Sequence, residues 1–204
     1  MSRLIFCTLF SIAMFMTAGC SQPTTKNMKF SKNEQKLIQE ADKILRVLTI
    51  ESAEDLEILR AKSTDLPKEE LSGETYKTLA DLMIATVTHP SQNGVGIAAP
   101  QVGINRRVVA VQRFDKENEP FELYPNIRIV WKSEAQNAGP EGCLSVPDRH
   151  GEVMRSQEII IEYADVTRLD QENYMVQETI TGFTAVIFQH EVDHLDGVLY
   201  IDKL

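Results

Sequence analysis

The stretch Gln189-His190-Glu191-Val192-Asp193-His194-Leu195-Asp196-Gly197 contains two histidines four residues apart. It completes an apolar segment, residues 183–195, whose polar residues stand at helix-compatible positions. On a helix, His190 and His194 project from the same face about one turn apart, so both imidazoles can reach one cation. Glu191 is displaced around the helix, which suits a base acting on water at that cation. The alternative is an ordinary amphipathic helix with surface histidines and a salt-bridged glutamate.

A catalytic site of this type needs a third protein ligand and one open position. Downstream, Asp196 follows the second histidine too closely to bend back easily, and Asp202 lies on a short terminal segment. Upstream, Cys143 stands in the sequence EGCLSVP. There Gly142 permits an unusual backbone and Pro147 ends the segment, which favours a shaped loop beside a ligand. A thiolate with two imidazoles favours Fe(II), Zn(II) or a similar ion, whereas the alternative for a lone cysteine is a buried small hydrophobe.

A third segment, GVGIAAPQVG at 94–103, is rich in small residues. It resembles a nucleotide-binding loop only superficially, because the third glycine is missing and the sequence predicts no strand before it. Small residues instead allow the backbone to approach a ligand closely. Gln101 carries an uncharged amide that can donate a hydrogen bond to a developing oxyanion. The alternative is a tight turn with a surface glutamine.

The segments GVGIAAPQVG, EGCLSVP and QHEVDHLDG, in this order, resemble the three signature motifs of peptide deformylase. The resemblance covers about residues 44–203. It implies an α+β fold, a single domain of short antiparallel β-sheets packed around a central HExxH helix. It also implies a metal-dependent hydrolase that removes the formyl group from the N-terminal N-formylmethionine of polypeptides and releases formate.

The resemblance implies roles for six residues in the chemistry. One divalent metal, Fe(II) first and Zn(II), Ni(II) or Co(II) as alternatives, would be bound by Cys143, His190 and His194. Glu191 would take a proton from water and return one to the departing amine. The tetrahedral oxyanion would be stabilised by the side chain of Gln101 and the backbone N–H of Leu144.

The resemblance also implies six substrate-binding positions. The methionine side chain would enter an apolar pocket lined by Val95, Val186 and Ile187. The extended peptide would pair in β-fashion with backbone groups around Gly96 and Gly142. Arg149 would help to hold the substrate backbone or the loop that carries it.

The first residues are typical of an export signal. Arg3 precedes an apolar run, residues 4–16, that is too short to cross a bilayer comfortably, and Thr17-Ala18-Gly19 precede Cys20. We therefore expect a signal peptide at 1–19, a lipidated Cys20, a linker with an N-terminal helix at 20–43, and the catalytic domain at 44–204. This predicts a membrane-anchored lipoprotein on the periplasmic or cell-surface side. The alternatives are an uncleaved anchor, a buried amphipathic helix, or a cytoplasmic protein whose translation starts at Met28.

Hydrophobic patterning predicts further elements between these motifs. Helices are expected at 34–44 and 67–89, and one or two helical turns at 54–60. Strands are expected at 44–50, 108–111, 127–131 and 158–163, with turns between strands at 172–173 and at Gly182.

The composition limits the possible partners. The 204 residues carry 21 Lys and Arg against 30 Asp and Glu, a formal net charge of −9, which argues against nucleic acid. The three cysteines cannot form a disulfide framework for a domain of this size. Ribosome docking is not expected, because the C-terminal helix common in the family does not follow the third motif. Two other functions stay open: a related metal-dependent amidase or peptidase with changed specificity, and a non-catalytic formyl-peptide-binding protein.

Overall fold

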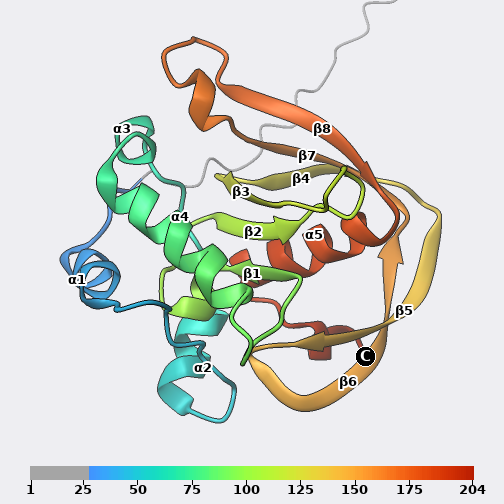
Figure 1. Ribbon diagram of the computed structural model, residues 1–204. Coiled ribbons are helices and arrows are strands. Elements are labelled where there is room, and N and C mark those ends of the chain that lie inside the picture. Colours follow the sequence, from blue (N-terminus) through green and yellow to red (C-terminus); the bar gives the residue numbers. More distant parts are fainter. Residues whose placement is uncertain (1–27) are drawn as a thin grey trace, which may run out of the picture.

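The central element of the fold is the helix α5 (Gly182–Leu195), around which three small antiparallel sheets are arranged (Figure 1). The computed structural model describes residues 28–204. The first sheet contains β1 (Gly96–Ala98), β2 (Val108–Gln112) and β3 (Phe121–Pro125). The second has the order β4 (Arg128–Lys132), β7 (Glu158–Ala164), β8 (Met175–Thr181), and the third pairs β5 (Gln136–Cys143) with β6 (Val146–Ser156). The predicted α+β class, with short antiparallel sheets around the HExxH helix, is confirmed.

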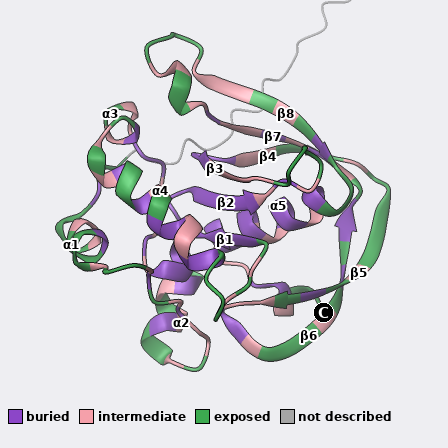
Figure 2. Ribbon diagram, viewed as in Figure 1, coloured by how far each residue is buried: buried purple, intermediate pink, exposed green. Residues whose placement is uncertain are grey.

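One apolar cluster holds α5 in place. Phe188, Val192 and Leu195 of the helix pack with residues of β2, β7 and β8 such as Val109 and Ile161. A second cluster joins the opposite side of the first sheet to the N-terminal helices. Figure 2 shows that α5 and β2 are largely buried, while the outer helices carry exposed faces. The helix that carries the two histidines is therefore the most enclosed helix of the fold, which limits its movement.

The N-terminal helices match the prediction in part. The helix α1 (Lys32–Glu40) begins at a capping box formed by Ser31 and Glu34 and ends four residues earlier than expected. The helix α2 (Ala53–Arg60) confirms the helical turns at 54–60. The expected helix at 67–89 is divided into α3 (Lys68–Leu71) and α4 (Glu74–Val87), because Gly73 interrupts it and acts as the N-cap of α4.

The prediction of a strand at 44–50 is wrong. The segment contains no strand, because its backbone N–H groups bond to three separate elements instead of one neighbouring strand. Leu45 N donates to the Thr86 hydroxyl at 2.9 Å, Leu48 N to the Gln101 carbonyl at 2.8 Å, and Ile50 N to the Ser145 carbonyl at 3.0 Å. The last two bonds tie this segment to the backbone of two of the three motifs.

The expected strands at 108–111, 127–131 and 158–163 are confirmed as β2, β4 and β7, and residues 172–173 lie in the connection to β8. Gly182 does not lie between strands as expected. It is the first residue of α5, and its φ of 63° turns the chain from β8 directly into that helix. Among residues 28–204, no helix is long and apolar enough to cross a membrane.

Candidate metal and active site

Three side chains from two motifs meet at one point. Cys143 is the last residue of β5, and His190 and His194 lie one turn apart on α5. Their sulfur and ring nitrogen atoms lie within 4.8 Å of one another, and Cys143 Sγ is 3.2 Å from His194 Nε2. The two downstream alternatives are engaged elsewhere, since Asp196 pairs with Arg107 and Asp202 with Arg60. One sulfur and two imidazole nitrogens form a donor set that fits Fe(II) or Zn(II).

The orientation of His190 is set by Glu141, two residues before the cysteine. Glu141 Oε2 lies 2.8 Å from His190 Nδ1, so Nε2 of the ring is left for a cation. Glu141 is buried, and Arg155 donates to both of its oxygens, at 2.6 and 2.8 Å. Burial raises the pKa of Glu141, but Arg155 and His190 outweigh this effect and hold the pKa at about 2. The motif position showed only that a carboxylate stands near the cysteine, so sequence reasoning missed this role.

The electrostatics of Glu191 suit proton transfer, and those of His194 suit ligation. Glu191 is buried, and burial raises its pKa to about 7. Its Oε2 is one of the few buried polar atoms in the described part of the chain without a hydrogen-bond partner. Burial and the neighbouring His190 lower the pKa of His194 well below its usual value, which keeps its imidazole neutral. Glu191 therefore has both an uncommitted oxygen and a pKa near neutrality, as a group that accepts and returns a proton requires.

Gln101 is almost fully buried, so the surface-glutamine alternative is wrong. It lies in the short 3-10 helix η1 (Ala99–Val102), which follows β1 directly. Its Oε1 accepts a hydrogen bond from Ala98 N at 2.8 Å, which directs the NH₂ group toward Ser145 Oγ at 3.2 Å and Cys143 Sγ at 3.5 Å. The amide donor is thus held beside the candidate ligand.

Side chains lie close against two of the motif glycines. A Cβ at Gly96 would lie 2.5 Å from Glu191 Oε1 and 2.8 Å from Ile187 Cγ2. A Cβ at Gly142 would lie 2.9 Å from the ring of His150. Gly142 has no positive φ, since the glycines with positive φ in the described part of the chain are Gly103, Gly182 and Gly197. The backbone is nevertheless irregular there, because the register of β5 against β6 shifts between Gly142 and Cys143. The expectation that Pro147 ends the segment is wrong, because the chain continues past it through β6.

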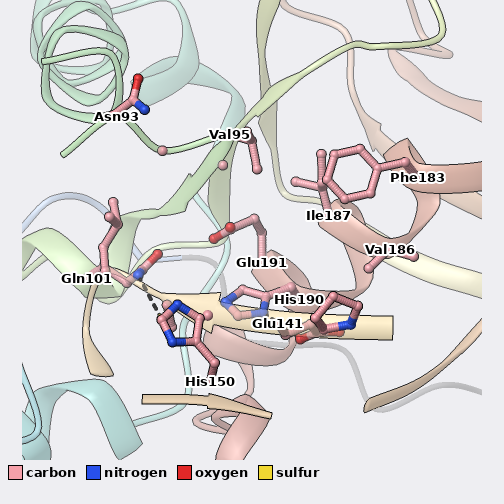
Figure 3. A pocket seen from close by; sticks show the side chains of 16 residues that line it. Asn93, Val95, Gln101, Glu141, His150, Phe183, Val186, Ile187, His190 and Glu191 are labelled. Atoms are coloured by element: carbon pink, nitrogen blue, oxygen red, sulfur yellow. Dashed lines mark hydrogen bonds and ion pairs between the residues drawn. The ribbon is translucent and has the colours of Figure 1, made fainter. Parts of the chain in front are cut away.

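A cavity of about 360 Å³ opens over these groups. Figure 3 shows Gln101 at one end and Phe183 and Val186 at the other, with Glu191 and His190 between them. Of the residues expected at the site, all but two line this cavity: Val95, Gly96, Gln101, Gly142, Cys143, Leu144, Val186, Ile187, His190 and Glu191. His194 lies beneath it, buried beside Cys143.

Arg149 is the other residue outside the cavity wall. Its side chain is exposed, and its carbonyl accepts a hydrogen bond from Tyr200 Oη at 2.8 Å. Sequence reasoning missed His150 and Phe183, which do line the cavity. The spacing of Phe183, four residues before Ile187 on the same helix, is the signal that could have identified it.

Comparisons with known proteins agree with this geometry. The family model for polypeptide deformylase matches residues 44–204. A peptide deformylase from Symbiobacterium thermophilum is 39% identical over 150 residues, which cover 74% of this chain and 64% of that protein. One from Leptospira biflexa is 38% identical over 156 residues, which cover 72% of this chain and 82% of that protein.

Solved structures give the same result at the level of the fold. The actinonin-bound class I type b peptide deformylase from Acinetobacter baumannii is 35% identical, with a TM-score of 0.67 over 78% of this chain and 97% of that chain. The enzyme from Thermotoga maritima is 31% identical, with a TM-score of 0.67 over 79% of this chain and 97% of that chain. These matches show that the chain belongs to the polypeptide deformylase family.

Proposed function

We propose that this chain hydrolyses the N-formyl group of N-formylmethionyl polypeptides and releases formate. The observation that carries the proposal is the convergence of the ligand trio Cys143, His190 and His194 with Glu191 and Gln101 in one cavity. The trio would hold a divalent cation, which we propose to be Fe(II); when bound it would act as a Lewis acid and lower the pKa of a bound water. Zn(II), Ni(II) and Co(II) suit the same donors.

Glu191 is the proton carrier of the proposed reaction. Its carboxylate takes a proton from the attacking water and delivers one to the departing amino group. Burial supports this role, because a carboxyl with a pKa of about 7 can both accept and donate near neutral pH. Gly96 lets this carboxylate lie against the strand β1, where a side chain would displace it.

Two donors stabilise the negative charge that develops on the formyl oxygen. The first is the Gln101 amide, whose orientation is fixed by its bond to Ala98 N. The second is the backbone N–H of Leu144, which follows Cys143 directly. Donors held in place before the reaction cost no reorganisation when the charge forms. A formyl carbon carries only hydrogen, so a tight oxyanion site also excludes larger acyl groups.

The strands that border the cavity supply the peptide-binding edges. Within residues 28–204, β1 pairs only with β2 and β5 only with β6, so one edge of each strand is unpaired. An extended peptide between them pairs with backbone groups around Gly96 and Gly142. Val95, Val186 and Ile187 take the methionine side chain. Arg149 supports the loop through its own backbone, which Tyr200 holds.

Formate release tests the proposal and separates it from the two alternatives. Residues 21–204, reconstituted anaerobically with Fe(II), are expected to release formate from formyl-Met peptides and to leave acetylated and unmodified peptides intact. Cleavage of the acetylated or unmodified peptide would instead indicate an amidase or peptidase with changed specificity. Binding of formylated peptide without release would indicate a binding protein.

We also propose that the chain is exported and lipidated at Cys20. Residues 1–27 lie outside the described part of the chain, so the support is the sequence order of Arg3, the apolar run and the small residues before the cysteine. The first described residues are held by Arg106, which donates to the carbonyls of Met28 at 2.9 Å and Lys29 at 2.7 Å.

Intact-mass analysis of membrane-extracted protein tests the lipidation. A diacylglycerol-modified N-terminus at Cys20 is expected, and Cys20→Ser should abolish both the modification and membrane retention. An unmodified chain beginning at Met1 or Met28 would overturn the proposal, and the latter would make the protein cytoplasmic.

A further inference from the structure

A second cavity, of about 590 Å³, adjoins the one over the ligand trio. It lies among β4, the start of β5, the junction of β6 and β7, and the N-terminal turn of α5. Phe183 and Val186 line both cavities, so the two are neighbours across these side chains. Trp131 lines only the second cavity and is 46% exposed. The described site for the formyl group and the methionine uses none of the residues that line the second cavity alone.

The strand β5 connects the two cavities. Its residues from Pro140 to Cys143 line the first cavity, and Asn137, with Ala135 just before the strand, lines the second. Asn137 lies five positions before Gly142, about 17 Å along an extended strand. A peptide that pairs with the edge of β5 near Gly142 therefore reaches Asn137 about five residues further on.

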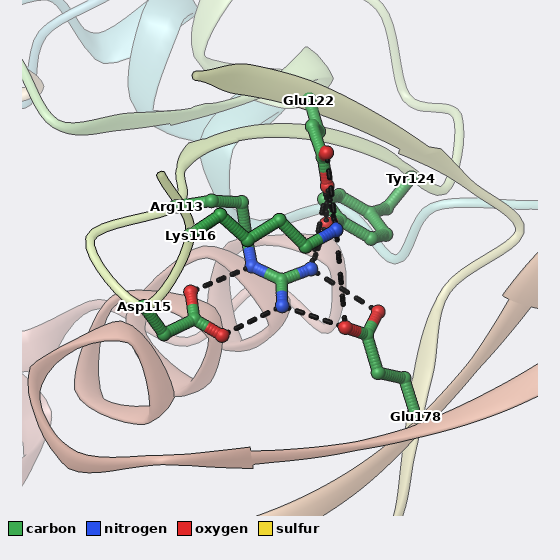
Figure 4. A network of polar contacts seen from close by, with 6 residues as sticks. All are labelled: Arg113, Asp115, Lys116, Glu122, Tyr124 and Glu178. Atoms are coloured by element: carbon green, nitrogen blue, oxygen red, sulfur yellow. Dashed lines mark hydrogen bonds and ion pairs between the residues drawn. The ribbon is translucent and has the colours of Figure 1, made fainter. Parts of the chain in front are cut away.

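The wall between the cavities is held firmly. The ring of Phe114 packs on Phe183 with 5.3 Å between the centroids. The preceding residue, Arg113, is buried, and its guanidinium bonds to Asp115, Glu122, Tyr124 and Glu178 (Figure 4). This network fixes the turn that carries Phe114 against the start of α5.

We propose that the second cavity is a distal subsite for the fifth or sixth residue of the formylated polypeptide. This inference rests on the proposed function, and it extends substrate recognition well beyond the methionine. The chemistry of the wall selects an apolar side chain, because Trp131 and Phe183 present aromatic surface. Arg155 adds no free positive charge, since it is paired with Glu141 and Asp193. Gln157 Nε2 donates a hydrogen bond to Asn137 Oδ1 at 3.0 Å, and both side chains are exposed. Their remaining donors and acceptors suit hydrogen bonds to a peptide backbone.

Peptide length tests the subsite. For the Fe(II)-loaded chain, kcat/KM is expected to be several-fold higher for formyl-Met-Ala-Ala-Ala-Leu-Leu-Ala than for formyl-Met-Ala-Ala. Replacing both leucines by aspartate should remove the gain. Trp131→Ala removes the aromatic wall of the second cavity, and Asn137→Trp fills the cavity itself. Both variants should abolish the gain and leave kcat/KM for the tripeptide unchanged. That unchanged value also reports an intact fold. Met154→Ala, at an exposed position of β6 outside both cavities, is the matched control and should keep the gain.

Trp131 provides a readout that does not depend on turnover, because it is the single tryptophan of the chain. Its fluorescence is expected to change when the deformylated heptapeptide is titrated into the loaded protein, and to stay constant with the deformylated tripeptide. Formate release without a length gain, or a gain that survives both Trp131→Ala and Asn137→Trp, would overturn the subsite and leave the proposed function intact. No formate from any peptide would overturn the proposed function instead.

Discussion

Glu141 Oε2 lies 2.8 Å from Nδ1 of His190, and the same carboxylate is held by two hydrogen bonds from Arg155. The candidate metal ligand His190 is thereby oriented by the buried carboxylate of Glu141, which is itself held by the buried guanidinium of Arg155. Carboxylates in this position set the tautomer and the basicity of a ligating imidazole. The contact joins β5 to α5, so it connects the second and third motifs through their side chains.

Removing the charge from this acid should weaken metal binding. Glu141→Gln is expected to lower the affinity for the cation by about 10- to 100-fold, because the imidazole loses its charged partner. Competition with a chelator measures the affinity directly. Glu152→Gln, on the exposed part of β6, is the matched control and should bind the cation normally. An unchanged affinity in Glu141→Gln would show that the contact does not support ligation.

Glu191→Gln should separate metal binding from turnover. The amide keeps the size of the side chain but cannot accept the proton, so kcat should fall by about 100- to 10,000-fold while metal content stays normal. Elemental analysis and formate release measure the two quantities. Cys143→Ala should instead lower the metal content, because it removes one of the three candidate ligands. Near-normal turnover in Glu191→Gln would remove Glu191 from the mechanism.

Gly96→Ala should impair catalysis without unfolding the protein. The new methyl group would meet the carboxylate of Glu191 at 2.5 Å and displace it, and a displacement of about 1 Å at a reacting group costs about 100-fold. The matched control is Gly139→Ala on β5, where an added Cβ meets nothing within 4 Å. We expect kcat/KM to fall only in the first variant, which should remain folded but melt at a lower temperature, because the methyl group also meets Ile187 Cγ2 at 2.8 Å. Equal activities would show that Glu191 can move freely.

The Arg113 network should make part of the stability sensitive to acid. Hydrogen bonds from Arg113 lower the pKa of Asp115 from its usual value of 3.8 to about 2, against the opposing effect of burial. Because the folded state lowers this pKa, the stabilisation is complete above pH 3.8 and is lost as the pH falls through 2. Because Asp115 is exposed, solvent screening reduces this contribution to about 1 kcal/mol or less of the free energy of unfolding.

Urea unfolding between pH 6 and pH 2 measures this contribution. Asp115→Asn should be less stable than the unmodified chain near neutral pH and should approach it as the pH falls to about 2. Glu117→Gln, at an exposed position of the same turn, controls for the loss of one negative charge. A constant difference between Asp115→Asn and the unmodified chain across this range would show that the ion pair adds no pH-dependent stability.

The elements predicted correctly are those whose signal is local. The helix of the third motif is recognisable because a repeat near 3.6 residues needs no distant partner, and β2, β4 and β7 carry runs of β-branched residues. The segment 44–50 carries the same kind of run but is not a strand, because a strand also requires a continuous neighbouring strand. Its N–H groups instead bond to Thr86, Gln101 and Ser145.

The sequence by itself identified the candidate metal ligands, the candidate base and the candidate amide donor. The spacing of His190, Glu191 and His194 on a helix fixes their directions, and the motif resemblance indicated Cys143 and Gln101. Only the tertiary structure decided which further groups surround them. Glu141 reaches the site because β5 lies against α5 there, and the second cavity exists because β4 and β7 pack beside the first turn of α5. These contacts join residues far apart in the chain, so periodicity and motif spacing contain no record of them.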